Sequence, residues 1–349
     1  MKRLSRTIVL IGLSIFCAPL AASAHEAYVL SKPQFDAGLA APQVDLLRAL
    51  ANPADLTTFF AIAVAVTTVL VAYFFAQHST LGRWIAAGFE RFKKYGPTVT
   101  RLTVVVALFL GWFDGAFLGP ELPISKMPFA PLVTGALLVA SVCILFGFLT
   151  EAAAAAAILA FLLATMAFGG YLATYANYLG EFLLLLLFGS RFLSVDGRLF
   201  GESKRLSWLK KHETAILRIF YGFALSYAAV NIKILHSQLT LDVINGFHLT
   251  KFHLLFPSDP LLVALGAAVA ELLIGVCIMI GFQTRLIILV SLFYITLSLL
   301  FFSEQAWPHI LLYGISFNLL VCPQTLSLDG FFDAKIRAWK EKGLGGSPV

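Results

Sequence analysis

Few charged side chains fall inside the long apolar stretches of this chain, and those few are the residues that could do chemistry. Glu271 lies about eleven residues into one apolar stretch, and Lys233 closes another. A carboxylic acid held in an apolar medium can carry a proton or contact a quinol, so we take Glu271 and Lys233 as the candidate catalytic pair. A structural interpretation stays open, in which Glu271 is a hydrogen-bonded clamp to a polar residue of a neighbouring helix: Lys233, Asn231, Tyr227 or Asn318.

Five of the seven histidines, His25, His236, His248, His253 and His309, fall in segments that we place on one side of the membrane. An amino-terminal histidine can chelate copper through its amine and imidazole, and other imidazoles could complete such a site. The spacings match no metal motif, however, and a bis-histidine haem needs imidazoles inside facing helices. We therefore predict no metal site, and these histidines remain weak candidates.

Further polar and aromatic residues complete the set of candidate binding residues: Asn231, Trp307, His309, Arg218 and Arg285. Trp307 opens the last apolar stretch, where tryptophan is an ordinary anchor at the lipid headgroups. It could also line the access route of a quinone. Arg218 and Arg285 lie near the opposite ends of their helices, where snorkelling and helix-end pairing explain them equally well.

The elements that position these residues follow from the composition. The chain has 349 residues, of which 59% are hydrophobic and only 13% charged. A water-soluble surface needs about a quarter of its residues charged, so this is an all-α, multi-spanning membrane protein. Its net charge of +6 fits basic cytoplasmic loops better than nucleic-acid binding. No nucleotide, flavin, haem or soluble-hydrolase motif is present, so the chain's predicted surroundings are the bilayer and redox partner subunits.

The first 24 residues have the pattern of a cleaved signal peptide, with a basic start, an apolar core and Ala22-Ser23-Ala24 before His25. Nine spans follow, at 56–76, 101–118, 130–149, 152–173, 178–193, 214–235, 260–281, 285–303 and 306–322. If His25 is extracytoplasmic, thirteen lysines and arginines fall in cytoplasmic segments and four outside. We therefore predict a bacterial-type inner membrane protein with a cytoplasmic carboxyl terminus.

Two parts of the chain resemble each other. Cys143 and Cys277 lie 134 residues apart, as do Gly147 and Gly281, and the tetrapeptide SVDG at 194–197 recurs as SLDG at 327–330. The pattern predicts a four-span unit copied in tandem, with both copies inserted in the same direction because four is an even number. The loop at 236–259 is the main insertion of the second copy. We interpret it either as the lining of a ligand route or as a cap over the bundle.

The second copy resembles the DoxX family of four-helix membrane proteins. The resemblance rests on Arg218, on Lys233 in AAVNIK, on Glu271 with Gly275, on Thr284-Arg285, and on LLYG before SLDG. It implies a four-helix bundle. It also implies a quinone-linked role like that of the DoxD-type subunit of thiosulfate:quinone oxidoreductase, which acts with redox partners.

The first copy departs from this pattern. Ala116 and Leu137 stand where Lys233 and Glu271 would align, and the copy carries instead Asp114 and Glu181, which we interpret as interfacial. The second copy is therefore the predicted working half, with quinone as the candidate cofactor. The alternative is a non-enzymatic scaffold or a module that handles small solutes or metals.

The predicted organisation is a signal peptide at 1–24, an extracytoplasmic segment at 25–55, an extra transmembrane helix at 56–76, a basic cytoplasmic loop at 77–100 containing an amphipathic helix at 83–96, a first DoxX-like unit at 101–197, a cytoplasmic linker at 198–213, a second DoxX-like unit at 214–330 and a cytoplasmic tail at 331–349.

Overall fold

The computed structural model describes residues 26–189, 193–201, 207–252, 256–322 and 325–344, and this part of the chain is helical without a strand. The predicted signal peptide, His25 and His253 lie outside the described residues. Within these described residues, six helices are long and apolar enough to cross a bilayer: Pro53–Gln77, Thr80–Phe113, Thr150–Phe188, Trp208–Ile234, Pro260–Ile280 and Thr284–Phe301. Two shorter apolar helices, Ala130–Phe146 and Trp307–Val321, accompany them. An all-α, multi-pass membrane protein is therefore confirmed.

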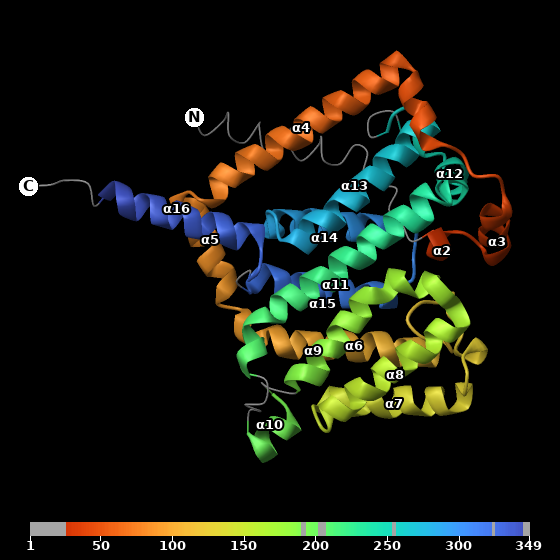
Figure 1. Cartoon of the computed structure of the whole chain (residues 1–349). Coiled ribbons are helices and arrows are strands. Elements are labelled where there is room, and N and C mark those ends of the chain that lie inside the picture. The colour runs from red at the N-terminus through yellow and green to blue at the C-terminus, as the bar shows by residue number, and fades with distance from the viewer. Residues whose placement is uncertain (1–25, 190–192, 202–206, 253–255, 323–324, 345–349) are drawn as a thin grey trace, which may run out of the picture.

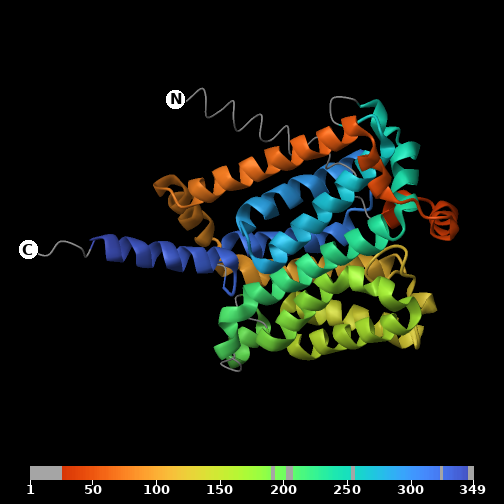
Figure 2. The same ribbon diagram turned by 45° about the horizontal axis from the view of Figure 1, so that its top comes forward.

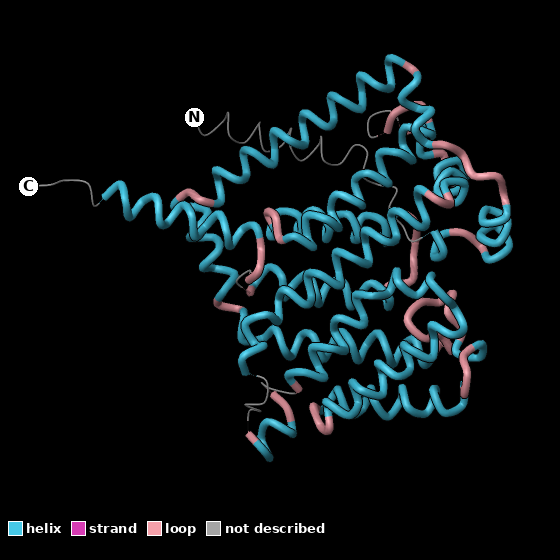
Figure 3. The backbone as a smooth tube through the Cα atoms, viewed as in Figure 1, coloured by secondary structure: helices cyan, strands magenta, loops and turns pink. Residues whose placement is uncertain are grey.

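The long helices lie side by side and connect alternately at two ends of the molecule (Figures 1 and 3). They are α4 (Pro53–Gln77), α6 (Gly96–Phe113), α7 (Ala130–Phe146), α8 (Thr150–Phe168), α9 (Ala176–Phe188), α11 (Glu213–Ala228), α13 (Pro260–Ile280), α14 (Thr284–Phe301) and α15 (Trp307–Val321). Short helices α2 (Glu26–Val29), α3 (Lys32–Ala40) and α12 (Ser237–Gly246) lie at one end, here called the α12 end. Helices α5 (Thr80–Glu90), α10 (Val195–Phe200) and α16 (Leu328–Leu344) lie at the other, the α16 end.

The packing divides the long helices into two groups that meet through their outer members (Figure 2). In the first group α6, α7, α8 and α9 contact one another in succession, and in the second α11, α13, α14 and α15 do the same. Between the groups α6 packs on α15, and α9 packs on α11. The first helix of each group therefore packs on the last helix of the other, and the core of Leu108, Ile144 and Ile315 is continuous across them.

The SVDG and SLDG segments perform the same local task in the two groups. The carboxylate of Asp196 accepts hydrogen bonds from the backbone N–H groups of Leu149 and Thr150 and so caps the start of α8. The carboxylate of Asp329 accepts hydrogen bonds from the backbone N–H groups of Gln283 and Thr284 and so caps the start of α14. A carboxylate at this position satisfies backbone donors that the helix itself leaves free and is favoured by the helix dipole.

The turns before these caps also match. Gly147 and Gly281 both have positive φ, 64° and 70°, which glycine adopts without a steric penalty. Leu149 and Gln283, the N-cap residues of α8 and α14, both have φ of 49°. Two segments far apart in the sequence therefore share one turn geometry.

Helix α4 stands apart from the bundle, as Figure 1 shows. No residue in its most apolar window is buried, and large apolar side chains such as Phe60, Val64 and Phe75 are more than half exposed. In water such a surface would be an aggregation site, whereas in a bilayer it faces lipid.

Several boundaries differ from the sequence prediction. Helix α6 starts at Gly96, five residues before the predicted 101, because Pro97 is suited to a first helical turn. The segment predicted as a loop at 236–259 forms α12, whose apolar side packs on α13 and closes the α12 end. The amphipathic stretch predicted at 83–96 is α5, followed by a 3₁₀ turn at Lys93–Tyr95.

Candidate functional site

The two predicted catalytic residues meet in a buried ionic triad with a third residue. The Nζ atom of Lys233 donates to Oε1 of Glu26 at 2.7 Å and lies 3.5 Å from Oε2 of Glu271. The side chains of Lys233 and Glu26 are 2% and 3% exposed, and that of Glu271 is 12% exposed. Glu26 Oε1 also accepts a hydrogen bond from the Thr240 hydroxyl at 2.8 Å. One ammonium therefore serves two carboxylates.

A local distortion of the helix lies at the position of Lys233. Helix α11 continues as a π-helical segment, η6, over Ala229–Ile234. A π-helical turn inserts an extra residue, and such turns are frequent at functional sites. Together the three side chains carry one positive and up to two negative charges, so binding one proton makes the triad neutral. This is a proton-binding arrangement of a kind that a low-dielectric interior favours.

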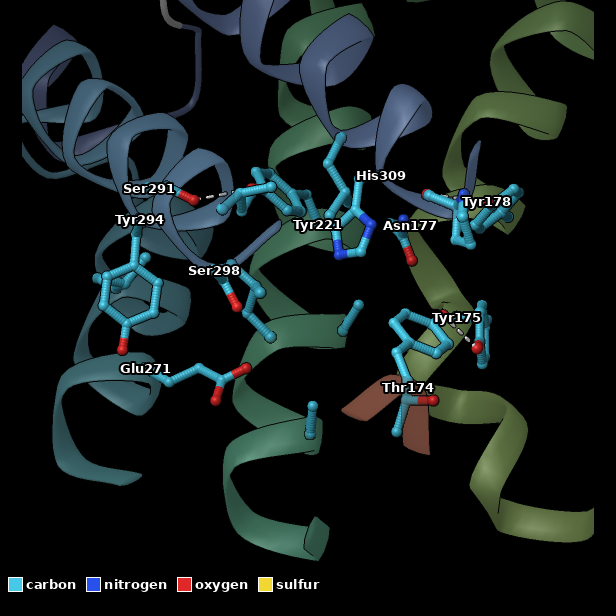
Figure 4. Close-up of a pocket in the computed structure, with 18 residues that line it drawn as sticks. Thr174, Tyr175, Asn177, Tyr178, Tyr221, Glu271, Ser291, Tyr294, Ser298 and His309 are labelled. Atoms are coloured by element: carbon cyan, nitrogen blue, oxygen red, sulfur yellow. Dashed lines mark hydrogen bonds between the residues drawn. The ribbon is translucent and has the colours of Figure 1, made fainter. Parts of the chain in front are cut away.

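Glu271 borders a cavity of about 90 Å³ among α11, α13, α14 and α15 of the second group. It is called the polar cavity here for the hydroxyl, amide and carboxyl side chains on its wall, although most of the wall surface is apolar. Its wall toward the first group carries Thr174, Tyr175, Asn177 and Tyr178 (Figure 4). The volume corresponds to about three water molecules at roughly 30 Å³ each. The cavity therefore lies between the two helix groups and can hold water beside the triad.

A second ionisable pair lies at this cavity, which its histidine, His309, lines. His309 Nε2 lies 3.0 Å from Glu304 Oε2, and Glu304 Oε1 accepts a hydrogen bond from Ser298 at 2.6 Å. His309 Nδ1 lies 2.9 Å from the carbonyl oxygen of Gln305 and must donate its proton there. On a third side, Tyr221 and Ser291 are joined by a 2.9 Å hydrogen bond.

An apolar cleft of about 310 Å³ lies on the other side of α13, between it and α4. Phe59, Val66 and Leu70 line it from α4, and Gly266, Ala270, Leu273, Ile274 and Cys277 line it from α13. Ile274 lines both the cleft and the polar cavity, and it lies one helical turn from Glu271. The cleft therefore places apolar space next to the wall that carries the triad.

Comparison of the chain with protein-family models, with curated proteins and with solved structures finds no match. The function must therefore be argued from the site itself.

The other predicted binding residues lie in different surroundings. Arg218 is 1% exposed and donates to the carbonyl oxygens of Met279, Thr325 and Leu326, so it ties α11 to the segment before α16. Arg285 donates to the carbonyl oxygen of Leu320 at 3.2 Å and lies 3.3 Å from Glu90. Both are at the α16 end, away from the cavity.

Asn231 and Trp307 lie nearer the triad but do not line the cavity. Asn231 donates to the Tyr227 hydroxyl at 3.0 Å. The indole N–H of Trp307 donates to Gln305 at 3.0 Å, and its ring is buried beside Gly111. Of the predicted binding residues, only His309 lines the cavity with Glu271.

The remaining histidines do not gather. His236 Nδ1 lies 2.6 Å from the Asn231 carbonyl oxygen, and His248 begins a 3₁₀ turn with positive φ. Within the described residues, no group of three histidines, cysteines or acids has metal-binding geometry. Glu181, which the sequence analysis interprets as interfacial, is instead fully buried in α9, because α6 and α11 pack against that helix from either side.

Sequence reasoning missed Glu26, Glu304 and the tyrosines Tyr28 and Tyr175. Glu26 lies in a short segment directly after the predicted signal peptide, where a charged residue is unremarkable. Its distance from Lys233, 207 residues along the chain, leaves no periodic signal. Glu304 also leaves no periodic signal, because it lies outside α15, and only spacings of three or four residues within a helix bring side chains together.

Proposed function

We propose that this protein is a membrane-embedded subunit that binds a quinone-type molecule in the cleft between α4 and α13 and exchanges protons with it through Glu271. One observation supports the proposal: the apolar cleft and the polar cavity, which Glu271 lines, are both bordered by Ile274. The cleft has the apolar lining that an isoprenoid tail requires, and the cavity has the proton-carrying groups that a quinone ring requires.

The chemistry divides between this chain and a partner. Reduction of a quinone to a quinol takes two electrons and two protons. A separate redox partner subunit supplies or accepts the electrons. The Glu26–Lys233–Glu271 triad holds a proton near the ring, and Lys233 keeps the buried carboxylates compensated as that proton leaves.

The finer architecture belongs to the same proposal. We regard α6–α9 and α11–α15 as tandem DoxX-like units, part of a nine-span chain. The matched Asp196 and Asp329 caps and the reciprocal packing of α6 on α15 and α9 on α11 support this duplication. The chain would then lie in a bacterial-type inner membrane, with a cleaved signal peptide, the α12 end outside and the α16 end in the cytoplasm.

A cleft-filling variant tests the proposal. The full chain is placed in lipid nanodiscs and titrated with decylubiquinone, with binding followed by equilibrium dialysis. We expect saturable binding by the wild type and its loss in Gly266→Trp, because the indole occupies the cleft. The matched control is Leu132→Trp, on a lipid-facing position of α7 that is 71% exposed. Equal partition into all three samples would refute the proposal.

One observation favours the scaffold interpretation instead: both carboxylates of the triad already contact Lys233, as a purely structural clamp would. A clamp predicts that Glu271→Gln alters stability without altering quinone chemistry. The proposed function predicts that Glu271→Gln mainly alters quinone chemistry. Measuring both stability and quinone chemistry in this variant therefore distinguishes the two interpretations.

A further inference from the structure

The loop between α6 and α7 carries an acid that points inward rather than to solvent. Phe117, Leu118 and Leu122 of this loop are at most 1% exposed, so they anchor it against the bundle. Between them, Glu121 is partly exposed as a residue, yet its Oε2 atom is buried. The carboxyl group is therefore turned into the interior, in a loop at the α12 end.

Two tyrosine hydroxyls from one 3₁₀ segment, η4 (Gly169–Tyr175), hold the other carboxyl oxygen. The Tyr171 hydroxyl donates to Glu121 Oε1 at 3.0 Å, and the Tyr175 hydroxyl donates to the same atom. The Tyr175 oxygen in turn lies 2.5 Å from the Tyr28 hydroxyl of α2. The result is an unbroken hydrogen-bonded chain from Glu121 through Tyr175 to Tyr28.

This chain ends at the polar cavity. Tyr175 and Tyr28 both line the cavity, and Figure 4 shows Tyr175 on the wall that faces Glu271 across it. The Tyr28 ring contacts the His309 ring edge to face, with 5.6 Å between centroids. Tyr171 does not line the cavity, so it is a side branch of the chain.

The groups that face Glu121 favour its neutral form. Burial raises the pKa of Glu121 above its ordinary value, and the hydrogen bonds from Tyr175 and Tyr171 only partly oppose this rise. Further titratable groups around the cluster are Tyr178 of α9, Glu26 of α2 and His309 of α15, whose ring contacts that of Tyr28. Burial and the charge of Glu121 also raise the pKa of Tyr28, so this phenol stays neutral and can pass a proton only by accepting one and donating another.

We propose that Glu121 is the proton-exchange site of the cavity, and that Tyr175 and Tyr28 relay protons between it and the cavity. For release, a proton from the cavity binds the Tyr28 oxygen while the Tyr28 hydroxyl proton passes to Tyr175. The Tyr175 proton then passes to the Glu121 carboxylate, which releases it to solvent at the α12 end. Each O–H bond that breaks is replaced on the same oxygen, so no phenolate forms and one proton leaves for each that enters.

This inference rests on the proposed quinone function, and quinol oxidation provides the test. Full-length protein loaded with decylubiquinol in nanodiscs is mixed with ferricyanide in a stopped-flow instrument. Each ferricyanide accepts one electron and no proton, so two of them convert the quinol to quinone and two protons leave. Absorbance reports quinone formation, and a pH-sensitive dye reports proton release.

We expect proton release from the wild type to keep pace with quinone formation. In Tyr175→Phe and Glu121→Gln, release should slow by roughly 10²–10⁴-fold, which is what a positioned proton-transfer group contributes. Tyr171→Phe is the matched control, because it removes a hydrogen bond to the same oxygen and leaves the relay intact. It should release protons at the wild-type rate.

The outcomes separate the two proposals. If decylubiquinol does not bind the wild type, the proposed function fails and the relay with it. If it binds and both relay variants release protons at the wild-type rate, only the relay is refuted. Equal slowing in Tyr171→Phe and Tyr175→Phe would also refute it, since it would indicate a general disturbance of the loop. If Glu121→Gln does not fold, Tyr175→Phe decides the question alone.

Discussion

Replacement of Lys233 by methionine tests how much the buried triad contributes to stability. The change keeps a similar volume and removes the ammonium that lies 2.7 Å from Glu26 and 3.5 Å from Glu271. With an effective dielectric constant of about 20, the attraction of each pair is roughly 5–6 kcal/mol before desolvation is counted. Desolvation offsets part of this, and loss of one partner from a buried pair costs about 3–5 kcal/mol.

We therefore expect Lys233→Met to lower the free energy of unfolding by about 3–5 kcal/mol near neutral pH. The loss should shrink in acid, because protonation of the two carboxylates removes the uncompensated charge. The assay is unfolding by SDS in mixed micelles, followed by tryptophan fluorescence. Lys32→Met is the matched control, because Lys32 pairs with Asp36 at 2.9 Å and both side chains are mostly exposed.

The control variant should change stability by no more than about 0.5 kcal/mol. A loss in Lys233→Met as small as that of the control would refute the claim that the triad is buried and coupled. Restoration of stability when Glu26→Gln is added would support it, since the extra substitution removes one of the two orphaned charges.

The remaining predictions concern single acids. Asp329→Asn and Asp196→Asn should each lower the free energy of unfolding by about 0.5–2 kcal/mol, as the loss of a helix cap does, and near-equal values would fit their matched geometry; no change in either would contradict the capping role. Because burial raises the folded-state pKa of Glu121 above 4.5, the folded protein keeps a proton that the unfolded chain releases. Stability should therefore fall as pH rises from the ordinary glutamate range to the raised pKa, and a pH series of SDS unfolding should show this slope weakened in Glu121→Gln. Glu271→Gln should leave decylubiquinone affinity within a few-fold and slow ferricyanide-driven quinol oxidation by roughly 10²–10⁴-fold, whereas an unchanged rate would favour the structural clamp.

The sequence was sufficient to predict the membrane class and most helix positions, because long apolar runs leave a strong local signal. It also located the two Asp-Gly segments, whose equivalent capping geometry follows from a turn chemistry that depends on neighbouring residues. Glu271 and Lys233 were found because a charge inside an apolar helix is conspicuous in any sequence. Lys233 lies in the π-helical segment Ala229–Ile234, and this distortion cannot be predicted from the sequence.

The rest of the site depends on contacts between distant segments. Glu26 approaches Lys233 only because α2 packs beside α12, and Glu121 approaches Tyr175 only because its loop folds inward. Residues in short polar segments have no periodicity, so their burial cannot be read from spacing. Arg218, a predicted binding residue, donates to three backbone carbonyls, a set of contacts that its position in the sequence does not predict.

Photolabelling tests the central claim most directly. A ubiquinone analogue with an azide on its ring is irradiated with the full-length protein in nanodiscs, and the labelled peptides are identified by mass spectrometry. The account predicts labelling around Leu273–Cys277 of α13 and Val66–Leu70 of α4, with suppression by excess decylubiquinone and by Gly266→Trp. Labelling that is spread over the lipid-facing helices, or that decylubiquinone does not displace, would contradict it.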